Sequence, residues 1–374
     1  MSRKGRLRKL KKEFEAEWSS HYWNFISRHL DERLDWKALS KCPYISTDII
    51  ENNLHLPWRI RYLSLNPNMN LKFVKKYSHW NWNWYFLSSV IPMKEILANL
   101  DLPWSWMLMS KNKELTMEVI ERFPDKNWGW SSISLLPFVN MKVINEHPDK
   151  RWLWYHVSLH PSITFKDVVN NPDKPWDWYA LAQNPNINIR TILRHRRHPW
   201  HWKALSRNRG MTMAAIENNP KRPWAWEAVS ENPNLTVQMV EDHHYENWCW
   251  ESVSRNVDIG HGPRMIELLH RLLQLFHMSM LSENPSVTID IIESHFLLQH
   301  MSWDWEHISK NTFHKEREAF LLEKAKKHIA AYRIQQCYSN ALTLPTNKLG
   351  KKLINKHYDE YVQSFKDLAA QIQG

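Results

Sequence analysis

Residues 171–186 read NPDKPWDWYALAQNPN and contain two tryptophans, a Pro-Trp step and two Asn-Pro pairs. The W-x-W pattern returns in WHWKALSRN at 200–208, WAWEAVSENPN at 224–234 and WCWESVSRN at 248–256. From Trp84 to Trp250 the second tryptophan recurs after 22 residues once and after 24 residues at every later step. Degenerate copies bring the number of units to twelve; they lie around Trp36, Ile60, Met278 and Trp305. A fixed period of this kind is typical of a tandem repeat array.

Each unit is predicted to begin with a short helix. When the second tryptophan is numbered zero, position +3 is always apolar and position +4 is serine in eleven units, with Ala182 as the exception. An apolar residue at +3 has helical spacing, and positions −2 and +2 form a second pair four residues apart. Proline at −3 fits the first turn of a helix. The small serine indicates a close approach of two helices, with its hydroxyl bonded to the carbonyl four residues back.

A second helix is predicted to follow in each unit. Asn-Pro at +6 and +7 ends the first helix, because proline disfavours helical geometry in the residue before it. In nine units position +10 is Ser, Thr or Asn, which cap helices, and positions +11 and +14 are mostly apolar. Two helices of about seven or eight residues fit one unit. We therefore expect an all-α fold, an α-solenoid of about twelve short helix-turn-helix repeats with helical N- and C-terminal caps. The cap residues and the low count of seven glycines argue against a β array.

The recurring tryptophans are predicted to pack between successive units, because isolated helices of this length are marginal in water. The predicted structural core consists of Trp84, Trp106, Trp130, Trp154, Trp178, Trp202, Trp226, Trp250 and Trp305. The alternative is a ladder of rings that stacks on bases or sugars. The charge of the array disfavours this alternative.

The net charge of +11 is concentrated at the two ends of the chain. Residues 1–12 contain seven Lys/Arg and no acid, and residues 315–374 contain eleven Lys/Arg and six Asp/Glu. The array between them is almost neutral, which excludes a basic groove that follows a phosphate backbone along it. The candidate residues for electrostatic contact are Arg3, Lys4, Arg6, Arg8, Lys9, Lys11, Lys12, Lys348, Lys351 and Lys352.

Three regions are expected on this basis. Residues 1–32 form a basic N-terminal arm and helical cap, 33–314 form the repeat array, irregular at 255–302, and 315–374 form a basic helical segment. Within the irregular part, an amphipathic helix is expected from Met265 to Phe276. The stretch AAYRIQQCYSNAL at 330–342 has an IQ-type pattern, but Tyr338 and Ser339 replace the expected basic and glycine residues. A capping helix is therefore favoured over calmodulin-like binding.

The sequence contains no signature of an enzyme, metal site or membrane span. Cys42, Cys249 and Cys337 are scattered and have no CxxC spacing, which argues against a disulfide framework or a zinc site. Nucleotide-binding, metalloprotease and nucleophile-elbow motifs are absent. There is neither an apolar run of about 20 residues nor a signal peptide. We expect a soluble intracellular protein that is not an enzyme and has no cofactor.

The unit NPDKPWDWYALAQNPNI resembles the Trp-rich NPDKPWDW tandem repeats of giant nucleocytoplasmic large DNA viruses, and the segment after the array is similar to the IQ-like segment that often closes such proteins. The resemblance covers about residues 33–365. It implies a repeat protein of the infected cell, located in the host cytoplasm (viral factory) or in the virion. Ile60 and Met278 replace tryptophan, and Asn208-Arg209 and Asn256-Val257 replace Asn-Pro.

The predicted function is a non-enzymatic scaffold for protein–protein interaction. The variable positions −1, +1, +12 and +16 are expected to form its exposed faces. The alternative is a nucleic-acid-associated protein that binds phosphates through the basic terminal segments.

Overall fold

In the computed structural model, the described part of the chain consists of residues 3–258, 276–293, 303–343 and 362–363. Within these residues the secondary structure is helical, apart from one isolated bridge between Thr236 and Asp258. The predicted all-α repeat fold is confirmed. The expected amphipathic helix between Met265 and Phe276 lies outside the described residues, except for Phe276 itself.

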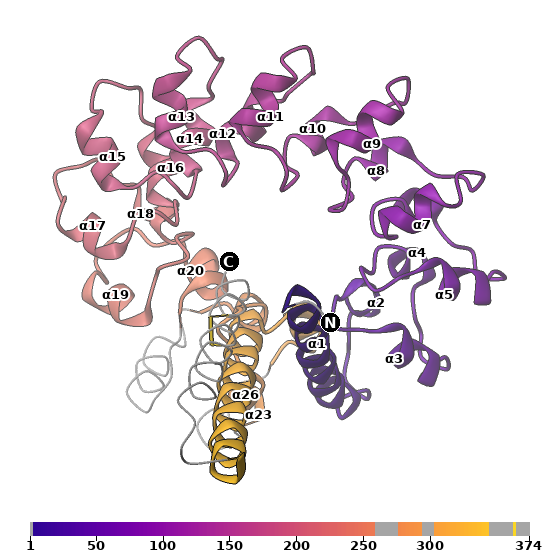
Figure 1. The fold of residues 1–374 in the computed structure, drawn as a ribbon. Coiled ribbons are helices and arrows are strands. Elements are labelled where there is room, and N and C mark those ends of the chain that lie inside the picture. Colours follow the sequence, from indigo (N-terminus) through magenta and orange to yellow (C-terminus); the bar gives the residue numbers. More distant parts are fainter. Residues whose placement is uncertain (1–2, 259–275, 294–302, 344–361, 364–374) are drawn as a thin grey trace. The chain divides into compact units, whose positions relative to one another are not determined.

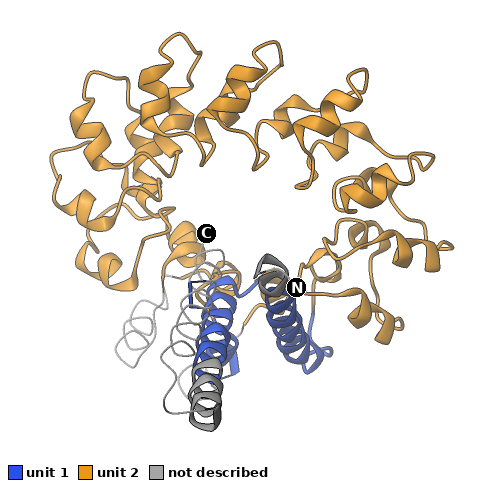
Figure 2. Cartoon of the chain, in the orientation of Figure 1, with its two compact units in different colours: residues 1–33, 288–293, 312–374 blue, residues 34–287, 294–311 orange. Residues whose placement is uncertain are grey.

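Two compact units make up the chain (Figure 2). One contains residues 1–33, 288–293 and 312–374, and the other contains residues 34–287 and 294–311. The second unit contains the repeat array apart from residues 288–293. The two terminal segments, expected as separate regions at 1–32 and 315–374, belong to a single unit together with residues 288–293.

Every repeat opens with a first helix that starts at position zero. Figure 1 labels most of these helices along the array. The first helices are α2 (Trp36–Lys41), α4 (Ile60–Leu63), α6 (Trp84–Leu87), α8 (Trp106–Met109), α10 (Trp130–Ile133), α12 (Trp154–Leu159), α14 (Trp178–Gln183), α16 (Trp202–Ser206), α18 (Trp226–Val229), α20 (Trp250–Asn256), α22 (Met278–Ser282) and α25 (Trp305–Ile308).

Among the described residues, second helices follow in ten of the repeats. They are α3 (Thr47–Asn52), α5 (Leu71–Lys76), α7 (Met93–Leu97), α9 (Met117–Arg122), α11 (Met141–Glu146), α13 (Phe165–Asn170), α15 (Ile189–Arg194), α17 (Met213–Glu217), α19 (Val237–Asp242) and α23 (Ile289–Glu293). The N-cap expected at +10 is confirmed: for example, the Ser46 hydroxyl and the Asn70 side chain accept from backbone N–H groups three residues on. Phe165 and Val168, at +11 and +14, are buried as predicted.

The first helices are shorter than predicted, and the tryptophan at −2 does not lie on them. They span four to seven residues, and positions −3 to −1 are extended, as in Pro57, Trp58 and Arg59. The proline at −3 therefore precedes the helix and does not occupy its first turn. In place of helical pairing, the indole N–H of Trp58 donates to the carbonyl of Asn53, at −7, over 2.8 Å. This bond recurs in nine repeats at 2.7–3.0 Å.

The other unit is built on two long helices, α1 (Arg3–Ser27) and α26 (His314–Thr343), with α23 beside them. Phe14, Leu321 and Ala325 form a buried cluster between the long helices. The guanidinium of Arg317 contacts the carboxylate of Glu15, and its Nε lies 3.1 Å from Oε2. The IQ-type stretch 330–342 lies on α26.

Candidate protein-binding surface

Tryptophan pairs join successive repeats. The ring at position zero of one repeat packs edge-on against the ring at −2 of the next, with centroids 5.1–5.3 Å apart and interplanar angles of 72–87° in eight pairs. This is a favourable geometry for aromatic rings. The −2 ring is buried in six of the eight pairs and half-buried in the other two: Trp152, for example, is 7% exposed, whereas its partner Trp130 is half-buried.

All nine tryptophans that the sequence analysis assigns to the core are half-buried in the structure. Eight of them, Trp84 to Trp250, contact an aromatic ring at position −2 of the following repeat; for Trp250 that ring is Phe276. The buried tryptophans at −2 were not singled out as core residues. A tryptophan directly after proline recurs at this position in several repeats, and this pattern could have identified the −2 tryptophans as core residues.

The serine at +4 makes two hydrogen bonds. Its hydroxyl donates to the carbonyl of position zero, as predicted, over 2.6 Å for Ser40 and Trp36. Its oxygen also accepts the backbone N–H of position −1 in the next repeat, over 2.9 Å for Arg59 and Ser40. The second bond is present at eleven joints, at 2.8–3.1 Å, and is missing where Ala182 replaces serine.

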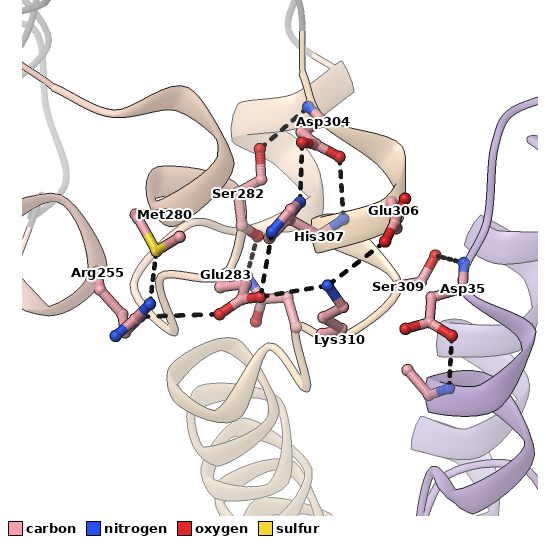
Figure 3. A network of polar contacts seen from close by, with 12 residues as sticks. Asp35, Arg255, Met280, Ser282, Glu283, Asp304, Glu306, His307, Ser309 and Lys310 are labelled. Atoms are coloured by element: carbon pink, nitrogen blue, oxygen red, sulfur yellow. Dashed lines mark hydrogen bonds and ion pairs between the residues drawn. The ribbon is translucent and has the colours of Figure 1, made fainter. Parts of the chain in front are cut away.

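One of these eleven bonds links the last repeat to the first. The backbone N–H of Asp35 donates to the Ser309 hydroxyl over 3.1 Å (Figure 3). Asp35 stands at −1 of the repeat at Trp36, and Ser309 stands at +4 of the repeat at Trp305. The array therefore closes through the same contact that joins its consecutive members.

Ion pairs reinforce the final joints of the array (Figure 3). The Glu283 carboxylate lies 3.8 Å from Arg255 Nε and 3.7 Å from both Lys310 Nζ and His307 Nε2. His307 Nδ1 lies 2.8 Å from Asp304. Burial raises the pKa of Asp304, but hydrogen bonds from the side chain and backbone of His307 outweigh it and hold that pKa below its usual value.

Asparagine at +6 forms a second ladder between repeats. The Asn184 side chain is fully buried, and its amide nitrogen lies 2.9–3.2 Å from three carbonyl oxygens of the preceding repeat. These belong to positions +4, +6 and +9, here Ser158, His160 and Ile163. Side-chain amides at +6 contact the preceding repeat in the same way in Asn66, Asn112, Asn208, Asn232, Asn256, Asn284 and Asn311. The backbone of the array is thus held by repeated polar contacts as well as by rings.

His160 occupies the +6 position of its own repeat. Its Nε2 donates to the carbonyl of Leu136 over 3.2 Å, and its Nδ1 accepts the Ser162 N–H over 3.1 Å. Burial lowers the pKa of His160, partly opposed by the bond to Leu136. The folded state therefore binds this proton less readily than the unfolded chain does.

Acidification is expected to destabilise the array at this joint. Stability should fall as the pH drops below the ordinary histidine pKa of about 6.5 and continue to fall through the lower folded-state value. His160→Asn, which installs the amide used by Asn184, should reduce this dependence. Urea denaturation between pH 7.5 and 5 measures it, with the exposed His55→Asn as control. An unchanged pH slope in His160→Asn would contradict the assignment.

In the repeats from Trp36 to Trp250, the side chain at position +1 is exposed on the surface of the array. These residues, here named the +1 row, are Lys37, Arg61, Tyr85, Met107, Ser131, Tyr155, Tyr179, Lys203, Glu227 and Glu251. Met107 is 53% exposed and Tyr85 is 48% exposed, which is high for large apolar side chains. Some residues of the row also contact the next repeat: the Arg61 guanidinium lies 5.5 Å from the Phe86 ring, and Tyr179 packs edge-on against His201 at 4.8 Å.

The other positions expected to be variable divide into two kinds. Side chains at +12 and +16 are exposed in the examples Lys166, Asn170, Arg190 and Arg194. Several at −1 instead cap the first helix; the Asp177 carboxylate, for instance, accepts from the Ala180 N–H over 2.8 Å. Several side chains at −1 therefore stabilise the first helix and are not free to form a binding surface.

Of the predicted electrostatic-contact residues, Lys9 and Lys12 are exposed and Lys11 is half-buried on α1. Arg3, Lys4, Arg6 and Arg8 lie on the same helix, but their side chains fall outside the described part. Lys348, Lys351 and Lys352 are also outside it. Among the described residues, no group of three or more His, Cys, Asp or Glu could hold a metal ion, and no helix has the length and apolarity of a membrane span.

Comparison with family models, with curated proteins and with solved structures found no match for this chain.

Proposed function

We propose that the protein is a non-enzymatic scaffold that binds a protein partner through the +1 row, in a virus-infected cell or in the virion. The virus context follows from the resemblance of the repeat unit. No residue is proposed to be catalytic. The observation that carries the proposal is the exposure of large apolar side chains at one repeated position of a tightly held backbone.

The composition of the row supports a protein partner. Tyrosine and methionine are enriched in protein–protein interfaces, and here they occupy four of the five consecutive repeats from Trp84 to Trp178. The basic residues of the row, Lys37, Arg61 and Lys203, are nearly balanced by Glu227 and Glu251. A phosphate backbone needs a continuous positive stripe, which this row does not provide.

Removing the three tyrosines of the row is expected to weaken partner binding by roughly 100-fold, because exposed aromatic anchors often contribute more than 1 kcal/mol each. The variant Tyr85→Ser/Tyr155→Ser/Tyr179→Ser uses the residue that the row already has at Ser131. Partners are first identified by proximity cross-linking in cells that make the protein. The affinity of an isolated partner is then measured by calorimetry.

The matched control is Lys142→Ser/Lys166→Ser/Arg190→Ser, three exposed residues of the second helices. It is expected to keep the partner. Thermal unfolding of both variants should remain close to that of the parent chain. An undiminished affinity of the tyrosine variant, or recovery of nucleic acid without a specific protein, would contradict the scaffold proposal.

A second candidate function is nucleic-acid association through the basic terminal segments. The exposure of Lys9 and Lys12 on α1 favours it, since both ammonium groups can reach a phosphate. This function predicts that nucleic acid is the recovered partner and that its binding weakens steeply with salt.

A further inference from the structure

Several repeats place a cationic or imidazole side chain over the tryptophan at position zero. The side chain comes from position −4 of the following repeat. Lys126 Nζ lies 5.1 Å from the centre of the Trp106 ring, and the Arg222 guanidinium carbon lies 5.7 Å from that of Trp202. The His198 ring stacks on Trp178 at 4.6 Å and 17°. These contacts bring positive charge or a polar ring to the electron-rich indole face.

At Trp226 the equivalent residue is an acid, Glu246. The aromatic neighbours of this ring come from the same repeat positions as those of Trp106. The His243 ring lies 5.2 Å from Trp226, where Phe123, at the same position −7, lies 5.0 Å from Trp106. Trp226 therefore has an aromatic neighbour from position −7, as Trp106 does, but no cation from position −4.

A half-open pocket of about 210 Å³ lies beside this ring. Trp224, Trp226, His243 and Tyr245 supply aromatic surface, and Glu217 and Glu246 supply carboxylates. Glu217 lies 3.2 Å from His243 Nε2, whereas the Glu246 carboxylate has no ion-pair partner among the described residues. Arg222 also lines the pocket, but its guanidinium is the one that lies over Trp202.

We propose that this pocket binds the cationic side chain of an arginine or lysine of a protein partner, which takes the place of the missing internal cation. The assignment of the ligand to a protein rests on the proposed function. Both a guanidinium and an ammonium suit the indole face, because Arg222 and Lys126 occupy the equivalent place in their repeats. The Glu246 carboxylate pairs with the incoming charge, and the aromatic walls favour a cation over a neutral group.

The direct test measures the binding of small probe molecules to the full chain by ligand-observed NMR. Nα-acetyl-arginine methylamide and Nα-acetyl-lysine methylamide, which keep their side-chain charge, are expected to bind. The neutral citrulline analogue should bind about tenfold more weakly than the arginine compound. Choline is included as a cation that is not a protein side chain. Equal binding of the arginine and citrulline compounds, or binding of choline alone, would overturn the proposal.

Glu246→Lys supplies the residue that the repeat at Trp106 uses, so the variant is expected to fold and to place its own ammonium over Trp226. Binding of the arginine probe should fall at least about tenfold. Glu118→Lys, an exposed site on α9 with the same change in charge, should leave it unchanged. Retained binding in Glu246→Lys would contradict the site.

The two proposals can fail separately. Probe binding to the parent chain tests the pocket without any partner, and the tyrosine variant of the +1 row should still bind the probe. If the probe binds but no partner depends on the row, the scaffold proposal fails and the pocket remains. If the partner binds and the probe does not, the pocket fails alone.

Discussion

Replacing Trp200 with alanine is expected to destabilise the array by about 4 kcal/mol, because it removes a large buried ring and leaves a cavity. Trp200 is 9% exposed and belongs to the core cluster that also contains Phe165, Leu181 and Leu205. Its ring packs edge-on on Trp178 at 5.3 Å, and its indole N–H donates to the His195 carbonyl over 3.0 Å. Urea denaturation followed by circular dichroism measures the loss.

Two further variants separate the contributions to this effect. Trp200→Phe keeps an aromatic ring but loses the indole donor, so a smaller loss is expected. Trp178→Ala removes the half-buried partner. It should lower the free energy of unfolding by roughly half as much as Trp200→Ala, because the Trp178 side chain buries less apolar surface in the folded state. A larger effect at Trp178 than at Trp200 would show that the ring at position zero is the main anchor.

Replacing Asn184 with alanine is expected to destabilise the array by about 3 kcal/mol, because buried carbonyl oxygens lose their hydrogen-bond donor. Its amide nitrogen contacts three carbonyls of the preceding repeat at 2.9–3.2 Å. Hydrogen exchange should locate the weakened protection in the repeats on either side of this joint.

Asn170→Ala is the matched control, since Asn170 is exposed on α13. It should change the free energy of unfolding by less than about 0.5 kcal/mol. If Asn184→Ala behaved like this control, the asparagine would serve only to end the first helix, as the sequence pattern alone suggested.

The predictable part of the fold is the part governed by local spacing. The apolar residue at +3 and the cap at +10 determine helices within one repeat, and both were identified correctly. The serine bond to the carbonyl four residues back was also anticipated. These interactions join residues three or four positions apart, and hence periodicity reveals them.

The interactions between repeats could not be derived in this way. Asn184 contacts carbonyls 21 to 26 residues away, and the serine oxygen accepts from a backbone N–H 17 to 23 residues along the chain within the array. Spacing alone also misplaced the −2 tryptophan, because its N–H closes a turn with position −7. The pocket at Trp226 could not be predicted from the sequence, because nothing in the sequence around Glu246 indicates that position −4 lies over the tryptophan of the preceding repeat. The structure shows this when equivalent positions of several repeats are compared.

The hydrogen bond between Asp35 and Ser309 limits how many repeats the array can contain. Tandem arrays with free ends tolerate duplication or loss of a terminal copy, because the remaining copies keep their geometry. Here a thirteenth copy would separate these two partners or alter the angle between all neighbouring copies. We therefore expect that adding or removing one copy would break the bond between Asp35 and Ser309.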